Sequence, residues 1–168
     1  IDASATGDTL TISGTTITNL AASAGSLVAI DADDTNSVTA ITVNESTSID
    51  QADTGISVDL SNNGGSTADI NNVDVNGTTT GVDVASVGAN ADAVNVTNSV
   101  FTQNTDGLSF AGTADATGAR YDVHFNTFEN NDDGVAVPTD PSGGDLTYNV
   151  TFNDFVDNNE NGVNIPNG

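Results

Sequence analysis

The chain has 168 residues and a formal net charge of −23, because 24 acidic residues face one arginine and no lysine. This charge excludes binding to nucleic acid and to anionic lipid surfaces, which carry the same sign. No apolar run reaches the roughly 18 residues that a membrane-spanning helix needs, so no membrane span is expected.

The composition favours strands and turns over helices. Thr, Ser, Asn, Asp and Gly are abundant, whereas Trp, Met and Cys are absent. Such residues suit short strands and tight turns. The acidic balance indicates a secreted or cell-surface protein, or one from a halophilic or marine organism, because salt screens the self-repulsion. The chain begins at Ile1 with no charged-then-apolar leader, which favours a processed secreted protein or an excised fragment.

Residues 1–36 are the least regular part of the sequence. The segments Leu10–Ile12 and 25–30 have strand-like apolar patterns at uneven spacing. Terminal repeats are commonly atypical because they cap a stack. We therefore expect irregular or capping turns over 1–36 and regular repeats over 37–168, within one domain that spans 1–168.

An internal repeat dominates the remainder of the chain. A glycine recurs at intervals of 26, 26, 27 and 28 residues, and an alternating apolar tripeptide follows it each time. The five glycines are Gly55, Gly81, Gly107, Gly134 and Gly162. A fixed period of this length indicates a stacked array rather than a globular core. We expect the glycine to take a positive φ or to let two backbones approach closely at a corner.

Other apolar residues recur at the same interval and predict vertical columns inside a narrow core. The columns are Val96, Val123 and Val150; Phe101, Phe128 and Phe155; and Val94, Tyr121 and Tyr148. Asn126 and Asn153 hold the same turn position in successive repeats, and Ser99 and Val73 hold it in the two earlier repeats. This spacing predicts a ladder of polar hydrogen bonds from turn to turn.

Longer polar excursions follow the glycine strands. They span about residues 61–69, 85–92, 111–120 and 138–147. Because each comes after the same strand of its repeat, all four are expected to emerge on one side of the coil.

The segments VHFNTFENNDDGVAV and VTFNDFVDNNENGVNI resemble the repeats of right-handed parallel β-helix proteins. Pectate lyases, polygalacturonases, alginate epimerases and many secreted surface proteins share that fold. The resemblance covers roughly residues 37 to 168. It implies an all-β protein, a right-handed parallel β-helix (solenoid) with about six turns of roughly 27 residues each, stacked at about 4.8 Å.

The catalytic sets of this family are not assembled in the sequence. Lyases with this fold pair an Asp-bound calcium with an Arg or Lys, whereas Arg120 is the only such cation here. Asn104-Thr-Asp106 and Asp132-Asp133 match two polygalacturonase elements in letters, but no Gly-His-Gly or Arg-Ile-Lys element follows. We therefore expect a protein that is not an enzyme.

Arg120 and His124 lie in one predicted strand. Alternation would point Asp122 and His124 outward, with Tyr121, Val123 and Phe125 facing the core. An outward His beside an acid is usually a solvated surface residue. The expectation is an ion pair between Arg120 and a neighbouring Asp rather than catalysis.

Clusters of oxygen-bearing side chains are weak candidates for calcium binding. They are Asp31, Asp33, Asp34, Asp132, Asp133 and Asp157. Stacked turns can bring carboxylates and carbonyls within coordination reach, but none of these clusters has EF-hand spacing. The alternative is that these are hydrated turn acids.

Four sequons mark candidate N-glycosylation sites at Asn44, Asn76, Asn95 and Asn149. In a sequence rich in Asn and Thr, several sequons arise by chance. Asn95 and Asn149 lie two repeats apart beside inward Val residues, so both are expected to point to solvent from the same face.

The absence of a catalytic set and the strand-like C-terminal segment favour a structural or adhesive module. The leading hypothesis is a β-solenoid that self-associates head to tail into a filament, sheath or surface layer, because unpaired strand edges invite pairing with another copy. The alternative is a carbohydrate-binding or polysaccharide-processing domain, for which glycans would be the partner and exposed sugar-stacking aromatics would be expected. A third possibility is a phage or virus fibre, which requires trimerisation.

Overall fold

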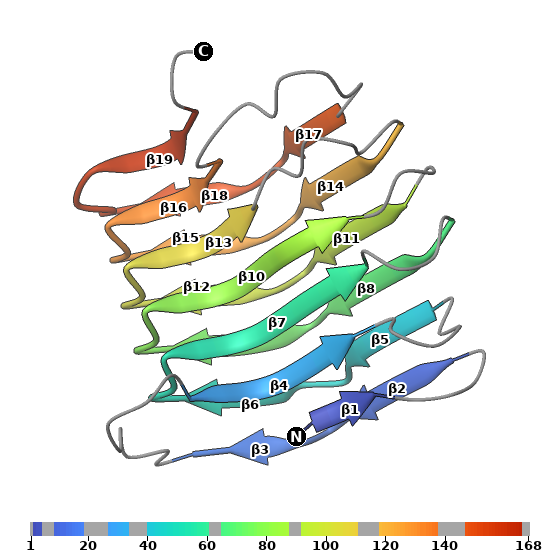
Figure 1. Cartoon of the computed structure of the whole chain (residues 1–168). Helices are drawn as coiled ribbons and strands as arrows, with labels where there is room; N and C mark the ends of the chain where they lie inside the picture. The colour runs from blue at the N-terminus through green and yellow to red at the C-terminus, as the bar shows by residue number, and fades with distance from the viewer. Residues whose placement is uncertain are drawn as a thin grey trace.

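The computed structural model of this protein is a parallel β-solenoid in which the chain winds as a right-handed coil (Figure 1). It describes residues 2–4, 9–18, 27–33, 40–60, 65–87, 92–110, 118–137 and 147–165. All strand pairing in these residues is parallel and runs between successive coils. The predicted right-handed parallel β-helix is therefore confirmed.

Three sheets form the sides of the solenoid, and each coil contributes one strand to each sheet. Within the described residues the first sheet has seven strands: β1 (Asp2–Ser4), β4 (Val28–Asp33), β7 (Thr54–Leu60), β10 (Thr80–Val87), β13 (Asp106–Phe110), β16 (Asp133–Ala136) and β19 (Asn161–Asn164).

The other two sheets each have six strands in the part of the chain that the structure describes. The second sheet contains β2 (Leu10–Ser13), β5 (Ala40–Asn44), β8 (Thr67–Asn71), β11 (Ala93–Thr97), β14 (Arg120–His124) and β17 (Thr147–Thr151). The third sheet contains β3 (Thr16–Ile17), β6 (Thr47–Asp50), β9 (Val73–Asn76), β12 (Val100–Thr102), β15 (Thr127–Glu129) and β18 (Asp154–Val156).

The glycine repeat sets the register of the regular coils. The strand pairs from β7 to β19 align each glycine tripeptide with the next, and these four pairings cover about four turns at the predicted period. The spacing is longer at the N-terminal end, where Leu10 pairs with Ile41 and Ile17 with Ile49. The regular part of the stack is thus shorter than the six turns expected.

The predicted aromatic columns fill the core of the later coils. Phe101 stacks on Phe128 at a ring-centroid distance of 5.1 Å, and Phe128 stacks on Phe155 at 5.2 Å. Tyr121 and Tyr148 stack at 4.9 Å. In the earlier coils smaller side chains hold the same positions, since the Phe column continues through Val75 to Ile49 and Ile17.

The predicted polar ladder is present, with Ser99 and Asn126 buried and Asn153 partly buried. The Asn126 Oδ1 accepts from the Ser99 backbone N–H at 2.9 Å, and the Asn153 Oδ1 accepts from the Asn126 N–H at 2.9 Å. The Asn126 Nδ2 also donates to the backbone carbonyl of Val96. Each Asn therefore satisfies buried groups of the preceding coil.

A second ladder of the same kind was not foreseen from the sequence. The Asn104 Oδ1 accepts from the Thr78 N–H, the Asn131 Oδ1 from the Asn104 N–H and the Asn158 Oδ1 from the Asn131 N–H. Asn131 is fully buried. Because buried backbone groups are costly to leave unpaired, these side chains fix the turns that follow the third sheet.

The repeated glycines are required by close approach between coils. A Cβ atom on Gly107 would lie 2.6 Å from the Gly134 carbonyl oxygen and 2.7 Å from Cδ1 of Phe128, both in the next coil. The glycine column therefore makes room for the Phe column. Of the two expectations for these glycines, close approach is the one that the structure supports.

Most of the predicted excursions lie outside the described residues, namely 61–64, 88–91, 111–117 and 138–146. Each connects a strand of the first sheet to a strand of the second sheet. No helix within the described part of the chain is long and apolar enough to cross a membrane.

Candidate functional site

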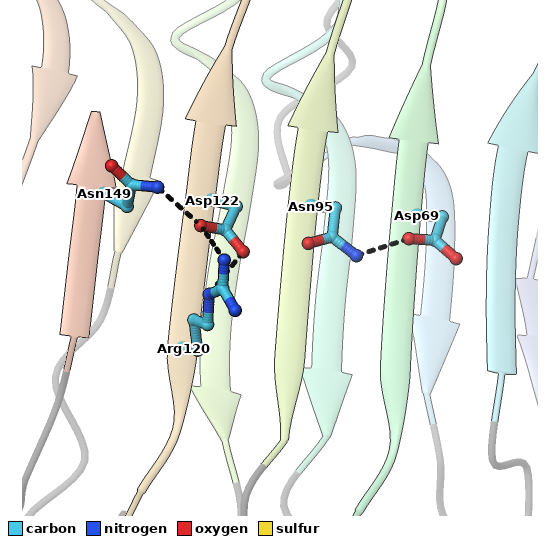
Figure 2. A network of polar contacts seen from close by, with 5 residues as sticks. All are labelled: Asp69, Asn95, Arg120, Asp122 and Asn149. Carbon is cyan, nitrogen blue, oxygen red and sulfur yellow. Dashed lines mark hydrogen bonds and ion pairs between the residues drawn. The ribbon is translucent and has the colours of Figure 1, made fainter. Parts of the chain in front are cut away.

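The outer face of the second sheet carries a row of alternating acids and amides. Asp69, Asn95, Asp122 and Asn149 occupy the same position on β8, β11, β14 and β17. Figure 2 shows that the Asn95 Nδ2 donates to the Asp69 Oδ1 at 2.6 Å and the Asn149 Nδ2 to the Asp122 Oδ1 at 3.0 Å. Pairing each Asp with an Asn of the next coil avoids stacking like charges.

The single arginine of the chain is part of this row. The Arg120 Nε lies 2.6 Å from the Asp122 Oδ2, and its Nη2 donates to the Asp122 Oδ1 at 2.9 Å (Figure 2). The predicted ion pair is confirmed, and its two contacts commit the guanidinium to Asp122. His124 is on the same strand, with its ring edge-on to Phe125 at 5.2 Å.

Three of the four sequon asparagines have structural contacts through the amide that a glycan would modify. Asn95 and Asn149 share one column of the second sheet, as expected, and both donate their Nδ2 to Asp side chains. The Asn76 Nδ2 donates to the Asp50 Oδ1 at 2.9 Å. Asn44 ends β5, and its Oδ1 is buried with no hydrogen-bond partner among the described residues. Glycosylation at these positions stays a prediction.

The candidate calcium ligands are dispersed or bound to amides. Asp132 accepts from Asn159, and Asp133 accepts from Asn161 and Asn164 through its two carboxylate oxygens. The remaining candidates are Asp31 and Asp33 on β4, Asp157 at an exposed turn, and Asp34, which lies outside the described residues.

No group of three or more His, Cys, Asp or Glu side chains in the described ranges is placed to hold a metal ion. Calcium binding at the candidate residues stays a prediction.

Two carboxylates on the outer face of the first sheet are held in an unfavourable environment. Burial raises the pKa of Asp83 above its ordinary value of 3.8. Burial also raises the pKa of Asp106, and the negative charges of Asp133, Asp132, Asp83 and Glu160 raise it further. Desolvation and like charges both disfavour the ionised form.

An exposed pair of phenylalanines marks the corner between the second and third sheets. Phe125 is 59% exposed and Phe152 is 78% exposed, and their rings stack at 5.5 Å. The prediction that Phe125 faces the core is therefore wrong. Strand β14 ends at His124, and Phe125 takes a φ of 60°, which turns its side chain outward.

The corner position requires a left-handed backbone in successive coils. Asn72 and Asn98 occupy it in earlier coils with φ values of 55° and 51°, and Phe152 has a φ of 55°. Asn tolerates this conformation, whereas for a bulky side chain it is an outlier and costs roughly 1–3 kcal/mol. The recurrence of Asn at this position is the signal that marks Phe125 as a corner residue.

A shallow groove runs along the same corner in the preceding coils. It has a volume of about 360 Å³ and is lined by Ser46, Asn72 and Asn98 at the corner and by Ser48, Asp74 and Val100 of the third sheet. The groove therefore reaches Asn98, which occupies the corner position one coil before Phe125.

The C-terminal coil, formed by β17, β18 and β19, lies at one end of the stack (Figure 1). Its core positions are Tyr148, Val150, Phe155 and Val163, and all four are partly exposed. Their counterparts one coil earlier, Tyr121, Val123, Phe128 and Val135, are fully buried. Burial of a coil thus depends on the coil stacked above it.

No family model, no curated protein and no solved structure matches this chain.

The raised pKa values predict that stability increases as the pH falls from neutral. The pKa of Asp106 is higher in the folded state than in the unfolded state, so the folded state binds more protons between these two pKa values. As the pH falls, the free energy of unfolding therefore rises through the folded-state pKa. It levels off once the pH is below the unfolded-state pKa. Asp106→Asn should therefore be more stable than the parent protein at pH 7, with the difference vanishing near pH 4. Denaturant unfolding at low salt measures this.

Asp154→Asn is the matched control, because it removes one exposed acid and changes the net charge equally. An Asp106→Asn variant that gains no more stability at pH 7 than Asp154→Asn would contradict the prediction.

Proposed function

We propose that this protein is a non-catalytic extracellular structural or adhesive β-solenoid that associates head to tail into a filament, sheath or surface layer. The observation that carries the proposal is the coil of β17, β18 and β19, whose core side chains are partly exposed, whereas the equivalent side chains one coil earlier are fully buried. Exposed strand edges and apolar core positions at one end favour association with a surface of the same architecture.

The first described coil at the other end supplies a matching set of positions. Leu10, Ile12 and Ile17 begin the columns that end at Tyr148, Val150 and Phe155. A second copy stacked in register would therefore place aliphatic residues on the last aromatic layer. Such a heterologous contact repeats without closing, which generates a filament.

Charge opposes this association at low ionic strength. Each copy carries a net charge of −23, so two ends repel each other. The Debye length falls from about 30 Å at 0.01 M salt to about 3 Å at 1 M. Assembly should therefore require high salt, and divalent cations such as calcium should promote it.

The test compares two valines with almost equal exposure. Val163 is 37% exposed at the core side of the last coil, whereas Val100 is 38% exposed on the outer face of the third sheet. Val163→Asp should lower the polymer fraction at about 1 M NaCl at least tenfold, because a buried unpaired charge costs several kcal/mol. Val100→Asp should leave the polymer fraction unchanged. Sedimentation and electron microscopy measure it.

Thermal unfolding of both variants checks that each remains folded. If the parent protein stays monomeric from 0.1 to about 2 M salt, with and without calcium, or if both substitutions act alike, the head-to-tail proposal is wrong.

The second candidate function is carbohydrate binding, as in the pectate-lyase-like proteins that the repeats resemble. The specific observation in its favour is the exposed Phe125–Phe152 stack beside the polar groove, since aromatic faces bind sugar rings and polar side chains orient them. The left-handed backbone at both phenylalanines is costly for a bulky side chain, which supports a role for the exposed rings.

Glycan-array binding followed by calorimetry tests this candidate. Phe152→Asn restores the residue type found in the earlier coils, so it should preserve the fold and abolish binding of any glycan detected, a loss of at least about tenfold in affinity. A parent protein that binds no glycan, or a variant that binds equally well, would remove this candidate.

A further inference from the structure

The corner between the second and third sheets forms one continuous column along the solenoid axis. The last residues of β8, β11, β14 and β17 pair with one another, so the corner residues that follow them are in register. We call these residues, with the one that precedes them, the corner column: Ser46, Asn72, Asn98, Phe125 and Phe152. Successive strands lie about 4.8 Å apart, so the column is a narrow track parallel to the axis.

The two rings of the corner column leave parts of their faces uncovered. Their centroids are 5.5 Å apart and their planes differ by 13°. Because the carbon atoms of stacked rings touch at about 3.5 Å, this centroid distance requires a sideways offset of about 4 Å. Phe125 is 59% exposed, although the strands on either side of it, β14 and β15, pair with strands of both neighbouring coils. Its exposure is therefore a property of the corner itself.

The earlier part of the corner column lines the polar groove. Asn72 and Asn98 contribute amides, and Ser46 and Ser48 contribute hydroxyl groups. The Asn72 Nδ2 donates to the Ser46 Oγ at 3.3 Å, so this amide and this hydroxyl lie side by side. Amides and hydroxyls both donate and accept hydrogen bonds, as the hydroxyl groups of a sugar do. The corner column therefore joins exposed rings to a polar end suited to sugar hydroxyls.

The charge of the protein restricts the class of sugar. The net charge is −23, and Arg120, the only Arg or Lys of the chain, is bound to Asp122. Among the described residues that line the groove, only Asp74 is charged, and it is an acid. A chain that carries uronate or sulfate groups would be repelled and would find no guanidinium or ammonium group to pair with. The surroundings of the corner therefore favour uncharged sugars.

We propose that the corner column binds an uncharged polysaccharide laid along the solenoid axis, with sugar rings on its two phenylalanines and sugar hydroxyls on its asparagines and serine. The proposal rests on the carbohydrate-binding candidate above, and it adds the class of sugar and the direction of the chain. From Phe152 to Asn72 the column extends over about 14 Å, because three strand spacings separate these positions. A ligand of four sugars therefore contacts both ends, whereas a disaccharide on the rings does not reach the groove.

Calorimetry with matched ligands tests the class of sugar. The uncharged probes are cellotetraose and mannotetraose, and each is compared with its C6-oxidised form, which has the same backbone and carries carboxylates. At about 0.1 M salt, the uncharged form should bind at least about tenfold more tightly than the oxidised form. The difference should shrink at about 1 M salt, because the Debye length falls to about 3 Å.

Substitutions that remove one amide test the direction of the chain. Asn72→Gly keeps the left-handed backbone, because Gly14 takes a φ of 57° at the same corner of an earlier coil. It should weaken the tetrasaccharide by about three- to tenfold through lost hydrogen bonds, and it should leave the disaccharide of the same sugar unchanged. Phe125→Asn should weaken both ligands at least about tenfold.

Asn130→Gly is the matched control for the groove variant. Asn130 lies at the corner between the third and first sheets with a φ of 56°, and Gly77 takes a φ of 67° at that corner two coils earlier. This variant should bind both ligands as the parent protein does. Thermal unfolding of each variant checks that it remains folded.

The outcomes separate this inference from the carbohydrate-binding candidate. If the oxidised probes bind as tightly as the uncharged ones, the class of sugar is wrong although carbohydrate binding stands. If Asn72→Gly binds the tetrasaccharide as Asn130→Gly does, the chain does not follow the corner column. If neither form of either probe binds the parent protein, the proposal is wrong as a whole, and an array that also detects no glycan removes the candidate itself.

Discussion

Each coil of this protein is completed by the coil that follows it. Backbone N–H groups in the turns donate to Asn side chains one coil later, as at Asn104 and Asn131. A Phe of the next coil likewise occupies the space over Gly81, Gly107 and Gly134, as Phe128 does over Gly107. Because these groups are buried and closely packed, neighbouring coils keep one register.

This dependence connects the core to the proposed assembly. The coil formed by β17, β18 and β19 has the same architecture as the coil below it, but its core side chains are partly exposed. In the proposed assembly a second copy would supply the complement, because Leu10 and Ile17 begin the same columns that Tyr148 and Phe155 end. The high net negative charge would make such a contact sensitive to salt.

The repeated apolar columns can be predicted from the sequence, whereas the second Asn ladder and the exposed Phe corner cannot. The Val, Phe and Tyr columns could be read from spacing, since apolar side chains contrast with their polar surroundings. The ladder through Asn104, Asn131 and Asn158 could not be predicted from the sequence, because Asn is common throughout the turns. Alternation predicts that Phe125 faces the core, but alternation fails where a strand ends in a left-handed corner residue.

In this stacking register, Gly55, Gly81, Gly107 and Gly134 are each needed by the coil stacked above them. The most direct measurement is the unfolding free energy of Gly107→Ala beside that of Gly162→Ala. A Cβ on Gly107 meets a backbone oxygen of the next coil at 2.6 Å, whereas a Cβ on Gly162 meets only the Phe155 side chain, at 3.2 Å. We expect Gly107→Ala to cost about 1–3 kcal/mol and Gly162→Ala clearly less. Equal effects at the two positions would contradict the stacking register on which the structure depends.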